Sequence, residues 1–290
     1  MTPSEQRTAL HRLGRRLSRA TSQAVRDFDM IEDGDRILCA VSGGKDSYVM
    51  HELLEEMRRR TPIRFELHAL NVDQGHPGYP AERLHRYMEH GQYAFTMVHE
   101  DTYSVVKEKV PEGKTTCSLC SRLRRGILYS EARRLGCNKL ALGHHRDDVV
   151  TTLMMNLFFS GQLKAMPPKL VNDEGDIQVI RPLAYCAEEH IATYAELRAY
   201  PIIPCVLCSG QLDHQRRVIG ELLAEVDRKH PGVRQRILAA LRNVRASHLL
   251  DIGLWRKLGL EVASSGPEDE GQGHNLVQLG RRPPASMFAE

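Results

Sequence analysis

One glycine-rich segment constrains the fold of this chain more than any other feature. The segment Ser-Gly-Gly-Lys-Asp-Ser at 42–47 follows a short apolar run at 35–41 and precedes a helical pattern that continues to Arg59. Glycines permit a tight turn in which successive N–H groups point at an anion at the start of the next helix. Lys45 adds a positive charge, and the hydroxyls of Ser42 and Ser47 add neutral donors. The segment predicts a strand, a phosphate-binding loop and a helix, although a plain strand-to-helix turn with an exposed lysine has the same pattern.

Alternating strand and helix patterns continue through the first half of the chain. Strands are expected at 65–72, 95–98 and 139–142, with helices at 81–90, 121–135 and 149–159. This order is typical of an α/β fold with a doubly wound, mainly parallel sheet. The predicted division is an N-terminal helical segment at 1–30, an α/β domain with the phosphate-binding loop at 31–161, a C-terminal extension at 162–260 and a mobile tail at 261–290.

Composition and charge exclude several classes of protein. No stretch approaches the roughly 18 apolar residues that a membrane span needs, and no signal-peptide core follows the N-terminus, so a cytoplasmic protein is expected. The arginine-rich opening at 7–26 also fits an organelle presequence, but Leu10, Leu13 and Leu17 recur at helical spacing and favour a structural helix. Net charge is only +3. A local basic cluster is more informative, and its members are Arg122, Arg124, Arg125, Arg133 and Arg134.

Two further polar segments follow predicted strands, at the sheet edge where open α/β folds bind ligands. One is Asn-Val-Asp-Gln-Gly at 71–75, which contains Asp73. The other is Gly-His-His-Arg-Asp-Asp at 143–148. Asp147 and Asp148 lie in a candidate ligand-binding loop, and they also fit the N-cap region of the next helix, where Asp is favoured. The two histidines need no chemical role in a polar loop.

The seven cysteines of the chain indicate metal ligands and core residues rather than disulfides, because no secretory signal accompanies them. Cys117 and Cys120 form one C-x-x-C pair, and Cys205 and Cys208 form a second. The long separation of the pairs argues against a compact zinc ribbon and for ligands gathered from distant segments. Zinc and an iron–sulfur cluster both fit these thiolates. The other three are expected to be small buried residues, namely Cys39, Cys137 and Cys186.

Together these segments resemble a known family. The segment at 42–47 is similar to the signature of PP-loop ATP pyrophosphatases, which cleave ATP between the α and β phosphates and transfer AMP to a substrate. With Cys-Ser-Leu-Cys-Ser-Arg-Leu-Arg-Arg-Gly at 117–126, the segment at 143–148 and Pro-Ile-Ile-Pro-Cys-Val-Leu-Cys at 201–208, the chain resembles the tRNA 2-thiocytidine synthetase family. The resemblance runs from about 35 to 250 and includes Ser-His-Leu at 247–249, where Ala246 replaces a proline of the family pattern.

The resemblance implies ATP-dependent thiolation of a cytidine at position 32 in the tRNA anticodon loop. It also implies Mg²⁺, a homodimer, a sulfur donor such as a cysteine desulfurase, and neither DNA nor a membrane as partner. A [4Fe–4S] cluster would be held by Cys117, Cys120 and Cys208, with Cys205 as a nearby thiol that relays sulfur or only packs. The expected nucleotide-binding residues are Ser42, Gly43, Gly44, Lys45, Asp46, Ser47, Asp73, Gly143 and His144. Asp46, Asp147 or Asp148 would serve the metal, and Arg124 would steady the adenylate.

Two other functions remain open at the level of sequence. A PP-loop enzyme resembling tRNA isoleucine lysidine synthetase would share the ATP chemistry but would need no cysteine cluster. A non-catalytic, zinc-bound RNA-binding module would use the basic helix alone. A brown colour after anaerobic purification would favour thiolation over the first alternative. Failure to release pyrophosphate in the presence of tRNA would favour the second.

Overall fold

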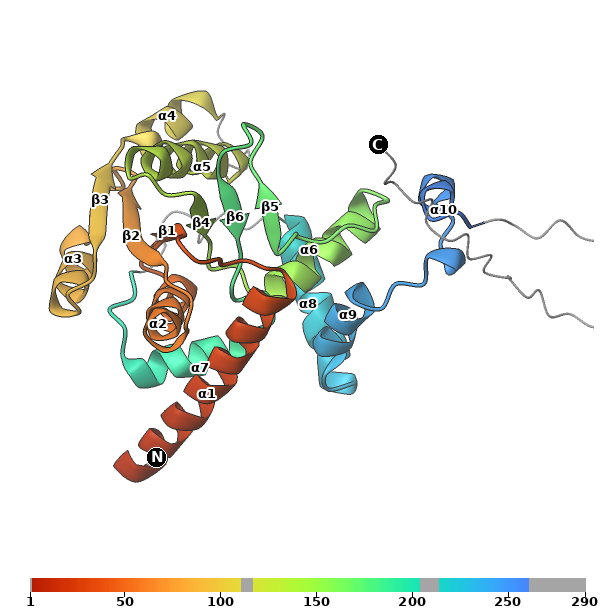
Figure 1. Cartoon of the computed structure of the whole chain (residues 1–290), viewed down its shortest axis with the longest axis horizontal. Helices are drawn as coiled ribbons and strands as arrows, with labels where there is room; N and C mark the ends of the chain where they lie inside the picture. Colours follow the sequence, from red (N-terminus) through yellow and green to blue (C-terminus); the bar gives the residue numbers. More distant parts are fainter. Residues whose placement is uncertain (1, 111–116, 204–213, 261–290) are drawn as a thin grey trace, which may run out of the picture. The chain divides into compact units, whose positions relative to one another are not determined.

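A central six-stranded sheet organises the chain. The computed structural model describes residues 2–110, 117–203 and 214–260. Strand order is β3-β2-β1-β4-β6-β5, and all neighbours are parallel except β5 with β6. The strands are β1 (Arg36–Ala40), β2 (Glu66–Asp73), β3 (Phe95–His99), β4 (Lys139–Ala141), β5 (Lys169–Val171) and β6 (Gln178–Ile180) (Figure 1). The predicted mainly parallel α/β fold is confirmed.

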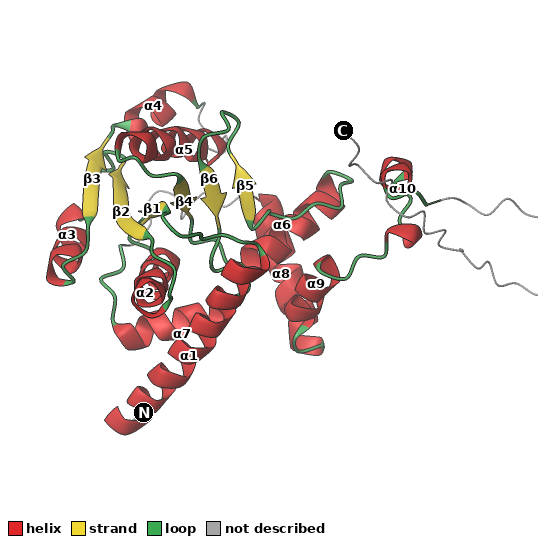
Figure 2. Cartoon of the chain, viewed as in Figure 1, coloured by secondary structure: helices red, strands yellow, loops and turns green. Residues whose placement is uncertain are grey.

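Helices cover both faces of the sheet (Figure 2). Because successive side chains of a strand point to opposite faces, Ile37 and Cys39 join one core cluster and Leu38 joins the other. The larger cluster includes residues of α1 (Pro3–Asp27), α2 (Lys45–Arg60), α3 (Ala81–His90) and α7 (Glu188–Arg198), while the smaller includes residues of α5 (Cys117–Arg134). The remaining helices are α4 (Thr102–Lys109), α6 (Arg146–Phe159), α8 (His214–Lys229), α9 (Val233–Leu241), the 3₁₀ turn η1 (Ala246–His248) and α10 (Ile252–Lys257).

The sequence patterns placed these elements well, with one difference. The helix predicted at 81–90 has these bounds, the strands predicted from 95 and 139 begin there, and the other predicted starts differ by a few residues. Cys39, Cys137 and Cys186 are buried, as expected. The segment after Gly161, however, contributes β5 and β6 to the same sheet, because β6 pairs with β4. The four-part domain division stays a prediction, and its tail at 261–290 lies outside the described residues.

Contacts divide the chain into two units, Met1–Arg234 and Gln235–Glu290. The second unit contains η1 and α10, which are joined by a hydrogen bond from the Trp255 indole N–H to the Leu249 carbonyl (2.6 Å). In the described ranges, no helix has the length and apolarity that crossing a membrane requires.

Candidate nucleotide and thiolation site

The predicted phosphate loop lies where the strand order of the sheet changes direction. From β1 the sheet grows through β2 and β3 on one side and through β4 on the other. Loops that leave the carboxyl ends of such neighbouring strands diverge and open a crevice for ligands. The loops after β1 and β4 meet here, since a Cβ built on Gly143 would lie 3.3 Å from the Asp46 carbonyl carbon and the Ser47 nitrogen. The structure therefore brings together two segments that are about 100 residues apart.

Gly43 connects the phosphate loop to the chain that leads into the second cysteine pair. Its φ of +83° is a left-handed conformation that favours glycine. A Cβ at this position would lie 2.8 Å from Cδ1 of Ile203. The Gly43 carbonyl accepts a hydrogen bond from the Ile203 N–H (2.9 Å), and the Tyr48 hydroxyl donates to the Pro201 carbonyl (3.2 Å). Residues 201–203 therefore form one wall of the loop.

Replacing Gly43 with alanine should destabilise the fold by about 1–3 kcal/mol, because it adds left-handed strain and a contact with Ile203. Gly44→Ala is the matched control, since the nearest atom to a Cβ there is Ser42 Oγ at 3.5 Å, an ordinary contact. Urea unfolding of the two variants measures the difference. Equal midpoints for Gly43→Ala and wild type would contradict the conformational requirement at Gly43.

The two serines of the loop shape it from within. Ser47 Oγ donates to the Gly44 carbonyl (2.8 Å) and accepts a bond from the Ser42 N–H (3.2 Å). Ser42 Oγ lies 3.4 Å from Ser47 Oγ and accepts from the Gly44 N–H at the same distance. The hydroxyl hydrogen of Ser47 is thus used inside the loop rather than pointing at a ligand. Sequence patterns could not show this, because both arrangements need the same residues.

Lys45 lies between two carboxylates. Its Nζ is 3.2 Å from Asp46 Oδ2 and 3.1 Å from Glu188 Oε1 at the start of α7. Burial alone would lower the pKa of Lys45, but Asp46 and Glu188 outweigh it and raise the pKa above its ordinary value. Lys45 is therefore a fixed positive charge at the N-terminus of α2, where the helix dipole also favours an anion.

Asp46 and Asp148 converge on one histidine. Nε2 of His145 lies 3.7 Å from Asp46 Oδ1 and 3.5 Å from Asp148 Oδ2. Asp148 Oδ2 also accepts a bond from the His145 backbone N–H (3.1 Å), which is helix capping of the expected kind. Asp46 Oδ1 is buried and has no hydrogen-bond partner among the described residues. A buried carboxylate oxygen without a donor is suited to a cation ligand.

Asp147 has a different environment from Asp148. Its Oδ2 accepts a bond from the Glu188 N–H (2.9 Å), and its Oδ1 lies 3.1 Å from Arg146 Nη2 and 3.2 Å from Arg234 Nη1. Burial opposes ionisation of Asp147, but the Glu188 N–H and the Arg146 guanidinium outweigh it and hold the pKa of Asp147 below its ordinary value. Asp147 therefore links α6 to α7, and its role as a metal ligand remains a prediction.

His144 faces a cluster of arginines. Its Nδ1 accepts a bond from Arg181 Nε (3.3 Å), and Arg181 Nη1 donates to the Pro167 carbonyl (2.6 Å). Burial, followed by the charge of Arg181, lowers the pKa of His144 to about 4, with smaller contributions from Arg124 and Arg216. His144 is thus neutral, with its other nitrogen carrying the proton. The charge of Arg124 therefore acts on the acidic loop, which contains both His144 and Asp148.

The loop after β2 places one cysteine of the first pair at the carboxyl edge of the sheet. Cys120 Sγ donates to Gln74 Oε1 (3.1 Å), and Thr102 Oγ1 bonds the same oxygen (3.2 Å). Both carboxylate oxygens of Asp73 have nearby partners. Its Oδ1 accepts from the Gly75 N–H (3.0 Å), and its Oδ2 lies 3.1 Å from His99 Nδ1. The backbone of Cys117 begins α5.

Cys205 and Cys208 lie outside the described residues, but the described residues on both sides of this pair contact the site. On the N-terminal side, Ile203 packs on Gly43. On the C-terminal side, Arg216 in α8 lies 3.4 Å from Asp148 Oδ1. The described residues that flank the second pair therefore contact the phosphate loop on one side and the acidic loop on the other.

Several residues of the site carry no motif signal. Glu188 begins a helix 143 positions from Lys45, Arg181 lies beyond the predicted domain boundary, and Arg216 follows the second cysteine pair. His145, rather than His144, contacts the carboxylates. Only the position of His145 inside a loop at a strand end could have indicated it.

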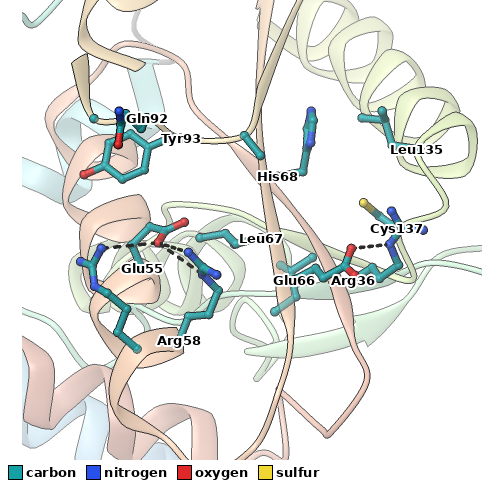
Figure 3. A pocket seen from close by; sticks show the side chains of 14 residues that line it. Arg36, Glu55, Arg58, Glu66, Leu67, His68, Gln92, Tyr93, Leu135 and Cys137 are labelled. Atoms are coloured by element: carbon teal, nitrogen blue, oxygen red, sulfur yellow. Dashed lines mark hydrogen bonds and ion pairs between the residues drawn. The ribbon is translucent and has the colours of Figure 1, made fainter. Parts of the chain in front are cut away.

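A cavity of about 640 Å³ lies at the amino ends of the strands, opposite to the phosphate loop. It is lined by the starts of β1 and β2, and Figure 3 shows its charges already paired. Arg36 Nε is 2.9 Å from Glu66 Oε2, and the buried Glu55 carboxylate is 2.9 Å from Arg58 Nη2. Because ligands of open α/β sheets bind at the carboxyl ends of strands, this cavity is not the nucleotide site.

Comparison with known proteins identifies the class and then the family. The PP-loop domain family matches residues 13–201, which include the phosphate loop and the acidic loop. A tRNA-cytidine(32) 2-sulfurtransferase of Sorangium cellulosum is 60% identical over 94% of this chain and 95% of its own length. Another from Dechloromonas aromatica is 53% identical over 93% of each chain. The chain belongs to the tRNA-cytidine(32) 2-sulfurtransferase family.

A solved structure agrees with the fold. The U34-tRNA thiolase of Methanococcus maripaludis, determined with its [4Fe–4S] cluster, superposes with a TM-score of 0.59 over 85% of this chain and 89% of that one. At 23% identity, this similarity supports the architecture of the sheet and its helices. The match to the PP-loop domain family and the two relatives named above confirm the resemblance found in the sequence motifs.

Proposed function

We propose that this protein is an ATP-dependent enzyme that replaces the C2 oxygen of cytidine 32 in tRNA with sulfur. The proposal rests on one observation. The phosphate loop, the acidic loop and described residues in or next to the two cysteine pairs lie together at the carboxyl ends of the strands. Gly43 contacts Ile203, Asp148 contacts Arg216, and Cys120 of α5 donates to Gln74 in the loop that follows β2. Membership of a family whose relatives carry this name supports it.

ATP binding is assigned to the N-terminus of α2. The first N–H groups of an α-helix have no partner within it, and a glycine loop lets phosphate oxygens approach them closely. Lys45 neutralises part of the phosphate charge. Its present partners, Asp46 and Glu188, would be free to turn toward a metal or solvent when the phosphates arrive.

Mg²⁺ fits Asp46 and Asp148. Described His, Cys, Asp and Glu side chains form no group of three or more that could hold a metal ion by itself. Mg²⁺ usually takes only one or two carboxylates, together with waters and substrate phosphates. The buried, unpartnered Oδ1 of Asp46 and the nearby Oδ2 of Asp148 meet that requirement.

A [4Fe–4S] cluster is assigned to Cys117, Cys120 and Cys208. The described Cys120 thiol lies beside Gln74 at the ligand-binding edge of the sheet, which suits a cluster that works near the nucleotide. Held by these three thiolates, a bound cluster would supply an open coordination position for the sulfur that is transferred. Cys205 is assigned as a thiol near this position.

The residues of the chain act on the first half of the reaction. The C2 oxygen of cytidine attacks the α-phosphorus of ATP, the bond to the β-phosphate oxygen breaks, and pyrophosphate leaves. Lys45 and the loop N–H groups stabilise the charge on that leaving group, and Arg124 stabilises the AMP ester. A sulfur nucleophile then displaces AMP from C2, because AMP is a far better leaving group than oxide. His144, neutral and half-buried, offers its protonated ring nitrogen as a donor to the nucleotide without adding charge.

Nucleoside mass spectrometry tests the proposal most directly. Anaerobically reconstituted protein, ATP, Mg²⁺, sulfide and unmodified tRNA should yield 2-thiocytidine together with AMP and pyrophosphate. AMP formation without 2-thiocytidine would favour a PP-loop enzyme of another chemistry. Tight tRNA binding without pyrophosphate release would favour the RNA-binding module.

Several features of the working enzyme belong to the same proposal. It acts in the cytoplasm, where tRNA and ATP are found, and it forms a homodimer. Its sulfur comes from a donor such as a cysteine desulfurase. Neither DNA nor a membrane is a partner.

The basic helix α5 is expected to contact tRNA. Arg122 and Arg125 are exposed. Replacing both with alanine should weaken tRNA binding and lower the slope of log K against log salt by about 0.7–0.9 for each phosphate that the variant no longer neutralises. Filter binding over a range of salt concentrations measures this. An unchanged slope would show that these arginines are ordinary exposed residues that do not contact tRNA phosphates.

A further inference from the structure

Helix α1 carries a stripe of arginines that the site does not use. With 3.6 residues per turn, five arginines fall within about 100° of one another around the helix axis. All five are exposed. The arginine stripe consists of Arg12, Arg15, Arg16, Arg19 and Arg26. At 1.5 Å per residue the stripe is about 21 Å long.

The opposite side of α1 is fixed to the rest of the protein. Leu17 and Ala24 are buried, and α1 packs against α2 and α7. Gly14 lets α1 approach α7 closely, since a Cβ there would lie 3.3 Å from the Tyr194 ring. Thr21 Oγ1 lies 3.4 Å from Cys186 Sγ. These contacts hold α1 in one rotation about its axis, so that the arginine stripe faces outward.

The charge of the stripe is not balanced by the acidic residues of its own helix. Glu5 takes part in the N-terminal capping box with Thr2. Asp27 Oδ2 accepts a bond from the Tyr185 hydroxyl (3.0 Å). A fixed row of guanidinium groups is well suited to bind phosphates, because each fork can bond two phosphate oxygens.

The stripe lies beside the helix that holds Glu188, the partner of Lys45. Burial, then the charge of Arg16, lowers the pKa of His190 in the first turns of α7. Glu188 begins the same helix and contacts Lys45 (3.1 Å). Figure 1 shows α7 crossing beside α1, in agreement with their contacts. A polyanion bound along the stripe would thus reach the start of α7, where Glu188 contacts Lys45 of the phosphate loop.

We propose that the arginine stripe of α1 is a docking surface for the sugar–phosphate backbone of tRNA. The stripe would contact tRNA outside the anticodon loop, which enters the site. The inference rests on the proposed function, since it takes tRNA as the substrate. Backbone contacts of this kind set the register of a nucleic acid without reading its sequence. A membrane surface fits less well, because a basic amphipathic helix must insert its apolar face, and that face is buried against α2 and α7.

A pair of matched double variants tests the stripe. One combines Arg15→Gln with Arg19→Gln, and the control combines Arg83→Gln with Arg86→Gln on the exposed side of α3. Both remove two positive charges from helices. The α1 variant should bind tRNA roughly tenfold more weakly at 0.1 M salt, and its salt slope should fall by about 1.5. Its KM for tRNA should rise, while kcat at saturating tRNA stays at the wild-type value. The α3 variant should match wild type.

Each outcome separates this inference from the proposed function. Failure of the wild-type protein to bind tRNA would overturn both. Wild-type thiolation with unchanged affinity and slope in the α1 variant would overturn the stripe alone. An equal loss in the α3 variant would show a general charge effect and would also overturn it. If phosphatidylserine vesicles bind wild type but not the α1 variant, while tRNA binding persists, the stripe is a membrane contact and the inference is wrong.

Discussion

Replacing Lys45 with alanine is expected to lower thiolation by at least about a hundredfold, to the background of the assay. The change removes the positive charge at the phosphate loop and leaves Asp46 and Glu188, its two partners at 3.2 and 3.1 Å, facing the incoming phosphates. Repulsion is thereby added to the loss of attraction. Pyrophosphate release and 2-thiocytidine formation should disappear together. The brown colour and the iron and sulfide content should remain, because Lys45 and the cysteines belong to different segments.

The exposed Lys229 at the end of α8 offers a control. It pairs with Glu225, four residues earlier on the same helix (2.7 Å), so Lys229→Ala should keep wild-type activity. Urea unfolding of Lys45→Ala shows whether the fold is retained. Wild-type thiolation in a folded Lys45→Ala variant would remove the phosphate loop from the mechanism.

The second large effect is expected at the second cysteine pair. Cys208→Ser should lose the brown chromophore and all thiolation, because a serine hydroxyl does not replace a thiolate ligand to iron. Cys205→Ser should keep the chromophore, whatever happens to turnover, and it therefore serves as the matched control three residues away. Absorbance and iron analysis after anaerobic reconstitution measure the cluster independently of activity.

Three results would change the assignment of these cysteines. Loss of the cluster in Cys205→Ser with retention in Cys208→Ser would exchange their roles. Loss in both would indicate a closed four-cysteine site and contradict the three-ligand proposal. Retention in both would place the cluster elsewhere.

Local sequence determined the class of fold and the chemistry of its loops. Apolar runs of strand length alternate with helical periodicity, and that alternation predicts a parallel sheet without any knowledge of contacts. The glycine segment at 42–47 and the acidic segment at 143–148 each follow a strand, so their places at the carboxyl edge could be deduced from topology alone. The resemblance of four short segments was enough to indicate the family, because each combines residue types that their local structure alone does not require.

Tertiary structure decided which groups act on one another. Glu188 became the partner of Lys45, and Arg181 the partner of His144, only when β4 paired with β6 and α7 packed beside α2. Burial then gave His144 and His145 different surroundings, although they are neighbours in the chain: one faces an arginine and the other two carboxylates. Periodicity and motifs report how a residue relates to its near neighbours along the chain. Partners that lie 37 or 143 positions apart, as in these two pairs, are set by strand pairing and helix packing, whose free energy is spread over the whole core.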